Sequence, residues 1–522
     1  MLAKGVRAGG YHIWLAAVLL LATSIQLWGI NRDLPHIAEI DEPTFVSIAV
    51  EIATTGNLAA ANMGHPGTTL TYPLAAIYRL DALLTGNDAL FTRAALMRDR
   101  LYAEDAWLYQ WGRLLAGAYA VGAAGLVFSL GRRLLDKRVG LVAALLFMSY
   151  PGVLLQTKLV RTDSASIFFT LLAFSTIWYW WDTPSRRRLM VVGLVIGMAI
   201  ASKYYLATLL ALPAGLICLR AWQGRSPDWV ARRPLGELAL LLLLAAAGLG
   251  LVHPYFYLDF PTTMRVLLFE ARTVHPGADG LGPAGNFLWY LGVALPANLS
   301  IWQLAIGLFG VSWAVYRRRA EPLWLLGFLL LFVLCISWLA LHQARWLLPV
   351  LPVLALCAGL GLVEASDRLV ARWGGTGRLR PGPVWVLTGL ALLPAIMVMV
   401  QTNRSLAAGS TRVLARDWVV NHIPQHANIA YEEYSIDDMS GYGFMRAFAL
   451  GNVGEDLAGL RARGYAYVVV SSEMYDRYLS DPERFAVEAA FYRALFREGE
   501  LLQEISPSRL HDGPTIRVYW IG

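Results

Sequence analysis

Eight ionisable side chains stand beside long apolar segments of this chain, where an isolated charge is costly and needs a reason. Cations at the edge of a membrane can bind a phosphate, and arginine can do so through two hydrogen bonds. A carboxylate beside them could take a proton from an acceptor hydroxyl as a general base. This combination suits attack by an acceptor on C1 of a sugar whose leaving group is a lipid phosphate. The eight residues are Asp41, Glu42, His65, Arg161, Asp163, Lys203, His342 and Arg345.

Their places in the sequence suggest separate roles. Asp41 is the best candidate base, because it lies near the start of a long polar loop that could cover a cavity. Lys203 and Arg345 are candidate phosphate ligands, and Arg161 and Asp163 share one turn between two apolar segments. We expect these residues to converge, because alternation of the spans puts all of their turns on one side of the membrane.

Each residue also has an explanation that involves no chemistry. Asp41 could cap a helix, and Asp163 could cap the fourth apolar helix. Lys203 could extend to the membrane interface, Arg345 could be a topological anchor, and His65 could be an ordinary loop histidine. These explanations serve each residue singly. They do not explain why four turns on the same side all carry such side chains.

The composition indicates a membrane protein. Of the 522 residues, 57% are hydrophobic and 16% are charged, and the mean hydropathy is +0.49. Soluble domains carry about 25% charged residues. The net charge of +7 does not indicate a nucleic-acid partner, because the arginines cluster in short loops between apolar runs, as positive-inside topology requires. The three cysteines fall inside apolar runs and predict no disulfide framework.

Apolar runs predict a polytopic helical protein with about eleven spans and a cytoplasmic N-terminus. The first run, Tyr11 to Ile30, has no small-residue cleavage site after it, so we interpret it as a retained helix and not as a signal peptide. An odd number of spans puts the C-terminus outside, on the same side as Asp41. The spans are expected near residues 11–30, 107–130, 139–156, 163–181, 189–203, 204–221, 236–257, 287–315, 323–341, 346–364 and 384–402.

Two long loops are expected on the outer face. Residues 31–106 contain segments of helical period, Thr44 to Ala53 and Tyr72 to Leu84, which should lie along the membrane surface. The second loop, residues 258–286, opens with an amphipathic stretch from Pro261 to Arg272. With these loops, residues 1–402 are expected to form one transmembrane domain.

Residues 403–522 have the composition of a soluble domain, and we expect an extracytoplasmic α/β unit there. Glu432 and Glu433 are interpreted as a solvated strand end. The expected helices are Thr411 to His422 after an N-cap at Ser410, Glu455 to Arg463 and Pro482 to Leu502, and the expected strands are Asn428 to Tyr431, Tyr465 to Ser471 and Thr515 to Ile521.

The same residues resemble the membrane glycosyltransferases of the GT-C fold, specifically the family 39 group of protein O-mannosyltransferases and lipid A aminoarabinose transferases. The resemblance covers essentially the whole chain, and its order and sidedness are more specific than any single motif. One departure is His65-Pro66-Gly67, where the family commonly has His-Pro-Pro. The matching elements are Asp41-Glu42, His65-Pro66, Arg161-Thr162-Asp163, Ala201-Ser202-Lys203-Tyr204, the run His342 to Pro349 with Pro352, and Asp417-Trp418 through Ala430.

The resemblance implies a role for each residue. Asp41 would be the catalytic base, Glu42 and Asp163 would be acidic residues near the acceptor, and Lys203 and Arg345 would contact the donor phosphate. Four further residues would line the cavity. No cofactor is certain, although a divalent cation at Asp41 and Asp163 is possible by this resemblance. The cavity-lining set is His65, Arg161, His342 and Tyr204.

The implied donor is a polyprenyl- or dolichyl-phosphate sugar, and the acceptor is left open among glycan, lipid and protein. Low lysine and high arginine and alanine content indicate a GC-rich bacterial source, and hence a multi-pass protein of the inner membrane. Two alternatives remain at this stage. One is an O-antigen-type polymerase or ligase, although the C-terminal soluble domain disfavours it. The other is a transporter or flippase of lipid-linked sugars, which would be expected to show two related halves.

Overall fold

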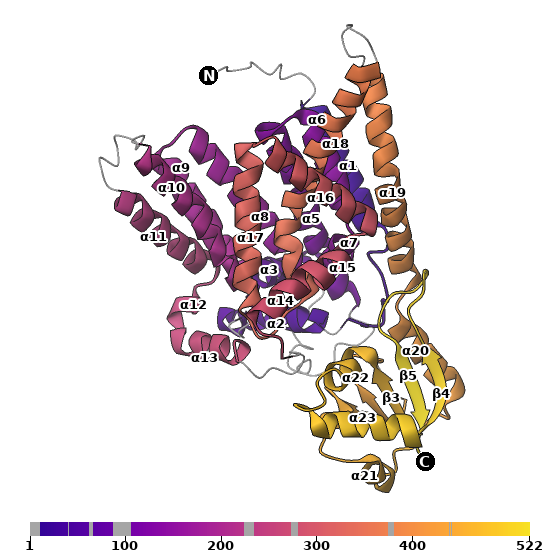
Figure 1. Cartoon of the computed structure of the whole chain (residues 1–522). Helices are drawn as coiled ribbons and strands as arrows, with labels where there is room; N and C mark the ends of the chain where they lie inside the picture. The colour runs from indigo at the N-terminus through magenta and orange to yellow at the C-terminus, as the bar shows by residue number, and fades with distance from the viewer. Residues whose placement is uncertain are drawn as a thin grey trace.

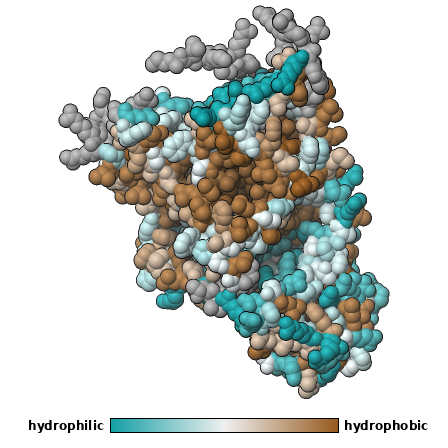
Figure 2. Space-filling view, in the orientation of Figure 1, coloured by the Kyte–Doolittle hydropathy of each residue, from teal (hydrophilic) through white to brown (hydrophobic). Residues whose placement is uncertain are grey.

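The computed structural model describes residues 11–39, 41–61, 66–86, 106–223, 234–272, 280–373, 381–437, 439 and 441–522. It consists of a large bundle of helices with a small α/β domain at the C-terminus (Figure 1). The surface over the middle of the bundle is apolar on the face shown in Figure 2, whereas the C-terminal domain and the opposite end of the bundle are polar. This distribution matches the solvent change from hydrocarbon to water at both membrane faces.

The helical part is assembled from many elements, several of which are short or bent. In chain order they are α1 (Tyr11–Leu27), α2 (Asp41–Thr55), η1 (Leu58–Ala61), α3 (Thr68–Thr85), α5 (Ala106–Leu134), α6 (Lys137–Met148), α7 (Pro151–Thr157), α8 (Asp163–Asp182), α9 (Arg186–Ser202), η3 (Tyr204–Leu210), α10 (Ala211–Trp222), α11 (Pro234–Val252), α12 (Tyr255–Leu258), α13 (Phe260–Glu270), α14 (Pro283–Trp289), η5 (Tyr290–Ala294), α15 (Leu295–Asn298), α16 (Ile301–Tyr316), α17 (Ala320–Ser337), η6 (Ala344–Val350), α18 (Leu351–Trp373) and α19 (Pro381–Ala408).

Each of the eleven expected spans falls on helical residues, but fewer helices qualify as spans by length and hydropathy alone. Among the described residues, six helices qualify by themselves, and α6 with α7 forms a seventh that is bent by 66°. Helices α1, α9 and α16 are only 16 to 17 residues long, near the lower limit for crossing hydrocarbon. Helix α8 is longer, but its serines, threonines and tryptophans lower its hydropathy.

The span expected over residues 287–315 is not one straight helix. It is divided into α14, the π-helical turn η5, α15 and α16. Pro296, near the N-terminus of α15, lacks the N–H that would continue the hydrogen-bond ladder, and Leu299 is extended. Ser300 then starts α16 with a capping box to Gln303. The periodicity of apolar residues could not show this interruption.

Glycines allow some of the spans to approach closely. A Cβ atom at Gly197 of α9 would lie 2.3 Å from the Ala245 carbonyl oxygen of α11, and one at Gly248 would lie 2.3 Å from the Leu194 carbonyl oxygen. Only glycine fits at both positions. Close backbone packing of this kind replaces the hydrophobic driving force that is missing between helices in lipid.

The short helices predicted on the surface are present. Helices α2 and α3 cover the expected segments, and their apolar sides form a separate core with Tyr78 and Tyr109. The amphipathic stretch expected from Pro261 forms α13, which α12 precedes. Helices α2, α12, α13 and α14 all lie at the end of the bundle nearest the C-terminal domain (Figure 1).

The C-terminal domain has a five-stranded sheet in the order β2-β1-β3-β5-β4. Strands β2, β1 and β3 are parallel, with β2 at the edge of the sheet, and β5 is antiparallel to both β3 and β4. Helix α20 has the bounds predicted from the sequence. The elements are α20 (Thr411–His422), β1 (Asn428–Glu432), β2 (Gly443–Ala447), η7 (Leu450–Asn452), α21 (Leu457–Ala462), β3 (Tyr467–Ser471), α22 (Ser472–Leu479), α23 (Ala486–Glu498), β4 (Glu500–Ile505) and β5 (Ile516–Trp520).

Two expectations for this domain were wrong. The helix expected from Pro482 to Leu502 ends at Glu498, because Gly499 is extended and the next residues pair with β5 as strand β4. Glu432 is not a solvated strand end, since it is fully buried. Its carboxylate accepts hydrogen bonds from Tyr492 and from the backbone N–H groups of Leu450 and Ser471.

The C-terminal domain is attached to the loop that follows α1. Arg32 donates to Asp512 at 2.7 Å, and the backbone N–H of Ser410 donates to Asp33 at 2.7 Å. Asp437 accepts a hydrogen bond from the backbone N–H of Ile37 at 3.2 Å. These contacts hold the domain beside the segment that leads into α2, and therefore beside Asp41.

Candidate active site

A small polar cavity of about 100 Å³ brings together residues from four separate turns of the bundle. Five of the residues predicted from the sequence line it, as the sidedness argument required. The lining residues are Asp41, Thr44, Phe45, Pro66, Arg161, Thr162, Asp163, Lys203 and Arg345.

Breaks in the helices place these side chains. Asp41 and Asp163 are the first residues of α2 and α8, where the helix dipole favours a negative charge. Lys203 is extended between α9 and the 3₁₀ helix η3. Arg345 lies in another 3₁₀ helix, η6, which contains Pro349. Both cations therefore occupy turns that interrupt apolar segments at the same end of the bundle.

Asp41 is held between two arginines. Its carboxylate lies 2.9 Å from Arg161 and 2.7 Å from Arg345, and its side chain is 30% exposed. Burial raises the pKa of Asp41, but Arg161 and Arg345 outweigh it and hold this pKa well below the usual value. Asp41 is therefore ionised at neutral pH.

Arg161 is nearly buried between two carboxylates. It pairs with both Asp41 and Glu39 and also donates to Gln156 at 2.7 Å. Burial lowers the pKa of Arg161, but Glu39 and Asp41 raise it by more than burial lowers it. The pKa of Arg161 is therefore above its usual value. Its charge is permanent, and its contacts fix its guanidinium in place.

Asp163 and Lys203 form the other ion pair of the cavity, at 3.4 Å. Asp163 is almost completely buried, whereas Lys203 is 14% exposed. With Arg161 and Arg345, the lining holds three cationic side chains and two carboxylates. The excess of one positive charge is the electrostatic setting that an anionic group such as a phosphate prefers.

Glu42 does not line the cavity, although the preceding residue, Asp41, does. It is fully buried and accepts hydrogen bonds from Arg113 at 2.6 and 2.9 Å and from the Val160 N–H at 2.9 Å. Arg113 also donates to the carbonyl oxygens of Ile30 and Arg32. Glu42 therefore joins α2 to α5 and to the turn before α8, and its contacts leave no oxygen directed at the cavity.

Two of the remaining predicted residues, Tyr204 and His342, lie outside the cavity lining. The Tyr204 hydroxyl is 3.3 Å from Nε2 of His253, and the His342 ring is 4.1 Å from the ring of Trp289. His65 lies outside the described residues, although the following residue, Pro66, is part of the lining.

The residues present do not fit a divalent-cation site at Asp41 and Asp163. Each carboxylate is already paired with a cationic side chain, and the three cations would repel a metal ion. Among the described residues, no cluster of three or more His, Cys, Asp or Glu side chains has the arrangement of a metal site. The charge of a bound substrate would have to be met by Arg161, Lys203 and Arg345.

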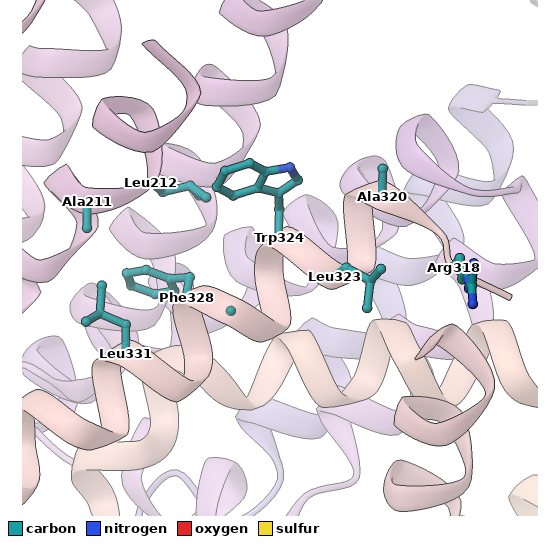
Figure 3. Close-up of a pocket in the computed structure, with 9 residues that line it drawn as sticks. Ala211, Leu212, Arg318, Ala320, Leu323, Trp324, Phe328 and Leu331 are labelled. Carbon is teal, nitrogen blue, oxygen red and sulfur yellow. The ribbon is translucent and has the colours of Figure 1, made fainter. Parts of the chain in front are cut away.

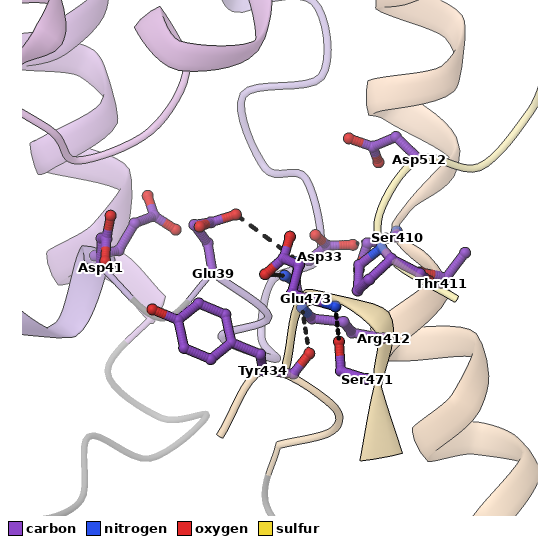
Figure 4. Close-up of polar contacts among 12 residues, drawn as sticks. Asp33, Glu39, Asp41, Ser410, Thr411, Arg412, Tyr434, Ser471, Glu473 and Asp512 are labelled. Carbon is purple, nitrogen blue, oxygen red and sulfur yellow. Dashed lines mark hydrogen bonds and ion pairs between the residues drawn. The ribbon is translucent and has the colours of Figure 1, made fainter. Parts of the chain in front are cut away.

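Three residues beside the cavity were not predicted. Glu39 pairs with Arg161, and Arg412 of α20 lies near Glu39. Figure 4 shows Tyr434 of the C-terminal domain with its hydroxyl directed toward the side on which Asp41 lies. Glu39 could have been noticed, because it precedes Asp41 by two residues. The sequence gives no comparable signal for Arg412 or Tyr434.

A second cavity has a different character. It measures about 480 Å³ and lies between α10 and α17. Apart from Arg318, its lining is apolar and includes Leu212, Trp324 and Phe328 (Figure 3). Such a surface can hold hydrocarbon but offers no group for acid–base chemistry.

A matching family model and two relatives of this chain are named as mannosyl or arabinosyl transferases. The model of the family described as dolichyl-phosphate-mannose-protein mannosyltransferase matches residues 101–257. The chain is 28% identical over 346 residues to undecaprenyl phosphate-alpha-4-amino-4-deoxy-L-arabinose arabinosyl transferase 1 of Pseudomonas fluorescens strain Pf-5, covering 63% of this chain and 56% of the relative. It is 29% identical over 304 residues to the corresponding transferase of Pseudomonas savastanoi pv. phaseolicola, covering 56% and 54%. The chain thus spans little more than half the length of these curated relatives.

Solved structures are similar over nearly the whole chain. ArnT from Cupriavidus metallidurans bound to undecaprenyl phosphate matches with a TM-score of 0.53 and 13% identity, over 99% of both chains. The oligosaccharyltransferase AglB from Archaeoglobus fulgidus, in complex with an inhibitory peptide and a dolichol-phosphate, matches with a TM-score of 0.56 and 14% identity, over 95% of this chain and 73% of AglB. At these identities the likeness concerns the fold. The chain is therefore a multi-pass protein of a bacterial inner membrane and has the GT-C fold.

Proposed function

We propose that this protein is a glycosyltransferase that moves a sugar from a polyprenyl-phosphate donor to an acceptor at the extracytoplasmic face of the inner membrane. The observation that carries the proposal is the cavity in which Asp41 and Asp163 meet Arg161, Lys203 and Arg345. Support comes from the relatives, which are named as transferases of an undecaprenyl-phosphate sugar. Support also comes from ArnT, which shares the fold and was solved with undecaprenyl phosphate.

The cations would bind the donor and stabilise its leaving group. A polyprenyl phosphate leaves with more negative charge than it carries as a sugar ester, so cations that face it stabilise the transition state more than the ground state. Arg345 suits this task because its side chain is part-exposed at the cavity, and Lys203 lies in the same lining. An arginine can bind two phosphate oxygens at once.

Asp41 would act as the base, and donor binding would prepare it. While both arginines contact Asp41, its pKa is too low for an effective base at neutral pH, because they stabilise the ionised form. A phosphate bound to Arg345 would compete with Asp41 for the guanidinium and add a second negative charge nearby. Both effects raise the pKa of Asp41. The proposed order of events is therefore donor first and proton removal from the acceptor second.

The distribution of basic residues supports one orientation of the protein in the membrane. Asp41 and the C-terminal domain lie at one end of the bundle (Figure 1). The start of α6 and the end of α18, which carry Arg138 and Arg372 and are joined by the ion pair of Arg138 with Asp367, lie at the other. The positive-inside rule assigns the arginine-rich end to the cytoplasm. We therefore propose that the N-terminus is cytoplasmic and that the cavity and the C-terminal domain are extracytoplasmic. The acceptor would carry a hydroxyl on a glycan, lipid or protein of that compartment.

The test is transfer of radiolabel from an undecaprenyl-phosphate sugar, aminoarabinose first, to envelope lipid, glycan or protein in proteoliposomes. Wild type should transfer label, and Asp41→Asn should lower kcat by about 10² to 10⁴. Arg345→Gln should raise KM for the donor and lower kcat. Asp182→Asn is the matched control, since it makes the same chemical change at an exposed ion pair with Arg133.

Three outcomes would count against the proposal. Wild-type activity in Asp41→Asn would remove Asp41 as the base. Movement of donor across the bilayer without transfer would favour a transporter. Equal losses in Asp41→Asn and Asp182→Asn would show a general effect of charge removal and not a role in the cavity.

A further inference from the structure

A row of alternating charges runs from the C-terminal domain into the cavity. Arg412 of α20 lies 3.9 Å from Glu39, Glu39 pairs with Arg161, and Arg161 lies 2.9 Å from Asp41. On the far side, Arg412 lies 2.8 Å from Glu473. Figure 4 shows the part of this row that crosses between the two domains. The row is continuous, although its members are far apart in the sequence.

Arg412 is held firmly within its own domain. It is only 5% exposed, its Nε donates to the Tyr434 carbonyl oxygen at 3.1 Å, and one terminal nitrogen donates to Glu473. The other terminal nitrogen faces Glu39. Because the guanidinium is planar, fixing two of its nitrogens also fixes the direction of the third. The C-terminal domain therefore presents one positive charge at a set position beside Glu39.

The positive charge of Arg412 helps to keep Glu39 ionised. Burial raises the pKa of Glu39, and nearby Asp41 raises it too, but Arg161 and Arg412 together lower it below the usual value. With Arg412 present, Glu39 stays ionised and divides its attraction between two arginines. Arg161 is already the nearer of the two arginines, and without Arg412 it would meet more of the attraction of Glu39 and be drawn away from Asp41.

We propose that Arg412 is a positioning residue of the active site, through which the C-terminal domain fixes Arg161 and Asp41 by way of Glu39. This inference rests on the proposed function of the cavity. It gives the C-terminal domain a part in the chemistry, because the cavity of the helical domain alone would hold Glu39 and Arg161 in a different balance. Arg412 itself need not touch either substrate.

Loss of the Arg412 charge should raise the pKa of Asp41. Tyr434 lies across from the charged groups around Asp41, which are Arg161, Arg345, Lys203, Glu39 and Asp163. Weakening the contact between Arg161 and Asp41 removes part of what stabilises the ionised carboxylate, so its pKa rises. The acidic limb of a pH–rate profile should then move to higher pH.

The experiment compares four full-length variants with wild type in the proteoliposome transfer assay. Arg412→Gln should lower kcat about tenfold to a hundredfold, change KM for the donor less than about threefold, and move the acidic limb upward. Arg412→Lys restores the charge without the planar fork and should recover part of kcat. Asp512→Asn is the matched control, since it breaks the other ion pair between the domains, with Arg32, without touching Glu39. Asp41→Asn reports whether the proposed function holds.

The outcomes separate the possibilities. Equal losses in Arg412→Gln and Asp512→Asn, with unchanged pH profiles, would mean that Arg412 only docks the domain and would overturn the inference. Wild-type kcat in Arg412→Gln beside an inactive Asp41→Asn would overturn it too, while leaving the proposed function standing. No transfer by wild type would overturn both. Melting temperatures in detergent identify a variant that fails to fold, in which case Glu473→Gln, which loosens Arg412 from its own domain, should lower kcat in the same direction by a smaller factor.

Discussion

The two ends of the helical bundle use ion pairs in different ways. At the arginine-rich end the pairs are open to solvent. Arg133 and Asp182 are 35% and 56% exposed, and Arg319 and Glu364 are 49% and 19% exposed. At the end beside the C-terminal domain the pair that fixes the start of α2 is shielded, since the side chains of Arg113 and Glu42 are 1% and 0% exposed. Arg345 and Asp41, at the cavity, are 26% and 30% exposed.

Energetics gives this difference a meaning. An exposed pair contributes about 0 to 1 kcal/mol, so the arginine-rich end gains topology from its charges more than stability. A buried pair must offset the desolvation of both ions, and apolar residues of the same shape would often serve stability as well. Charges that are kept despite this cost are expected to fix positions. Glu42 and Arg113 fix the start of α2, and hence Asp41.

Breaking the buried pair should have the largest effect on stability. Arg113→Met leaves Glu42 as an uncompensated buried charge, and we expect a loss of about 3 to 5 kcal/mol in the free energy of unfolding. The double variant Arg113→Met/Glu42→Leu should recover much of that loss. Thermal unfolding in detergent measures both. A double variant no more stable than the single one would show that the pair contributes stability and not only position.

Glu432 is a second buried carboxylate that can be compared with Glu42. Whereas Glu42 contacts an arginine, Glu432 accepts hydrogen bonds from neutral donors. Burial raises its pKa to about 7 from 4.5, against hydrogen bonds from Tyr492, Ser471 and Leu450. Its stabilising contribution is therefore complete below pH 4.5 and is lost as the pH rises through about 7, amounting to on the order of 3 kcal/mol. Hydrogen exchange of β1 and β3 amides between pH 5 and 8.5 should follow this slope.

Glu432→Gln provides the comparison for that slope. It should lower stability at pH 5, because the amide places a donor against backbone N–H groups, but it should remove the dependence on pH. If the exchange rates of wild type and variant change in parallel with pH, after correction for intrinsic exchange, Glu432 is not the titrating group.

Changing the exposed end should have the smallest effect. Arg319→Gln removes one of two arginines that contact Glu364, and we expect a change below about 0.5 kcal/mol in stability and no change in transfer. The same detergent melts and transfer assay measure it. A loss as large as that of Arg113→Met would mean that the two ends do not differ as their exposures indicate.

The sequence carried enough information to predict much of this arrangement. Apolar run length located the spans, and the alternation of their sides predicted that the residues of the cavity would share one face. These residues are Asp41, Arg161, Asp163, Lys203 and Arg345. These predictions succeed because hydrocarbon thickness and the positive-inside bias act on whole segments. The bounds of α20 followed in the same way from local periodicity.

Other features depend on contacts that the sequence does not reveal. Asp41 and Glu42 are adjacent, but successive helical residues point about 100° apart. Which one faces the cavity depended on Arg113, which is remote in sequence. Tyr204 was predicted to line the cavity beside Lys203, yet its hydroxyl is directed to His253. Similarly, β4 could not be separated from the preceding helix without its pairing to β5.

The contacts between the loop after α1 and the C-terminal domain also set an order of assembly. Arg32 and its partner Asp512 are 480 residues apart in the chain, and the whole helical bundle lies between them. The segment leading to Asp41 thus obtains these partners only after the intervening helices and the C-terminal domain have been synthesised. A chain truncated in α23 would keep all of its apolar helices and would still lack the Asp512 that pairs with Arg32.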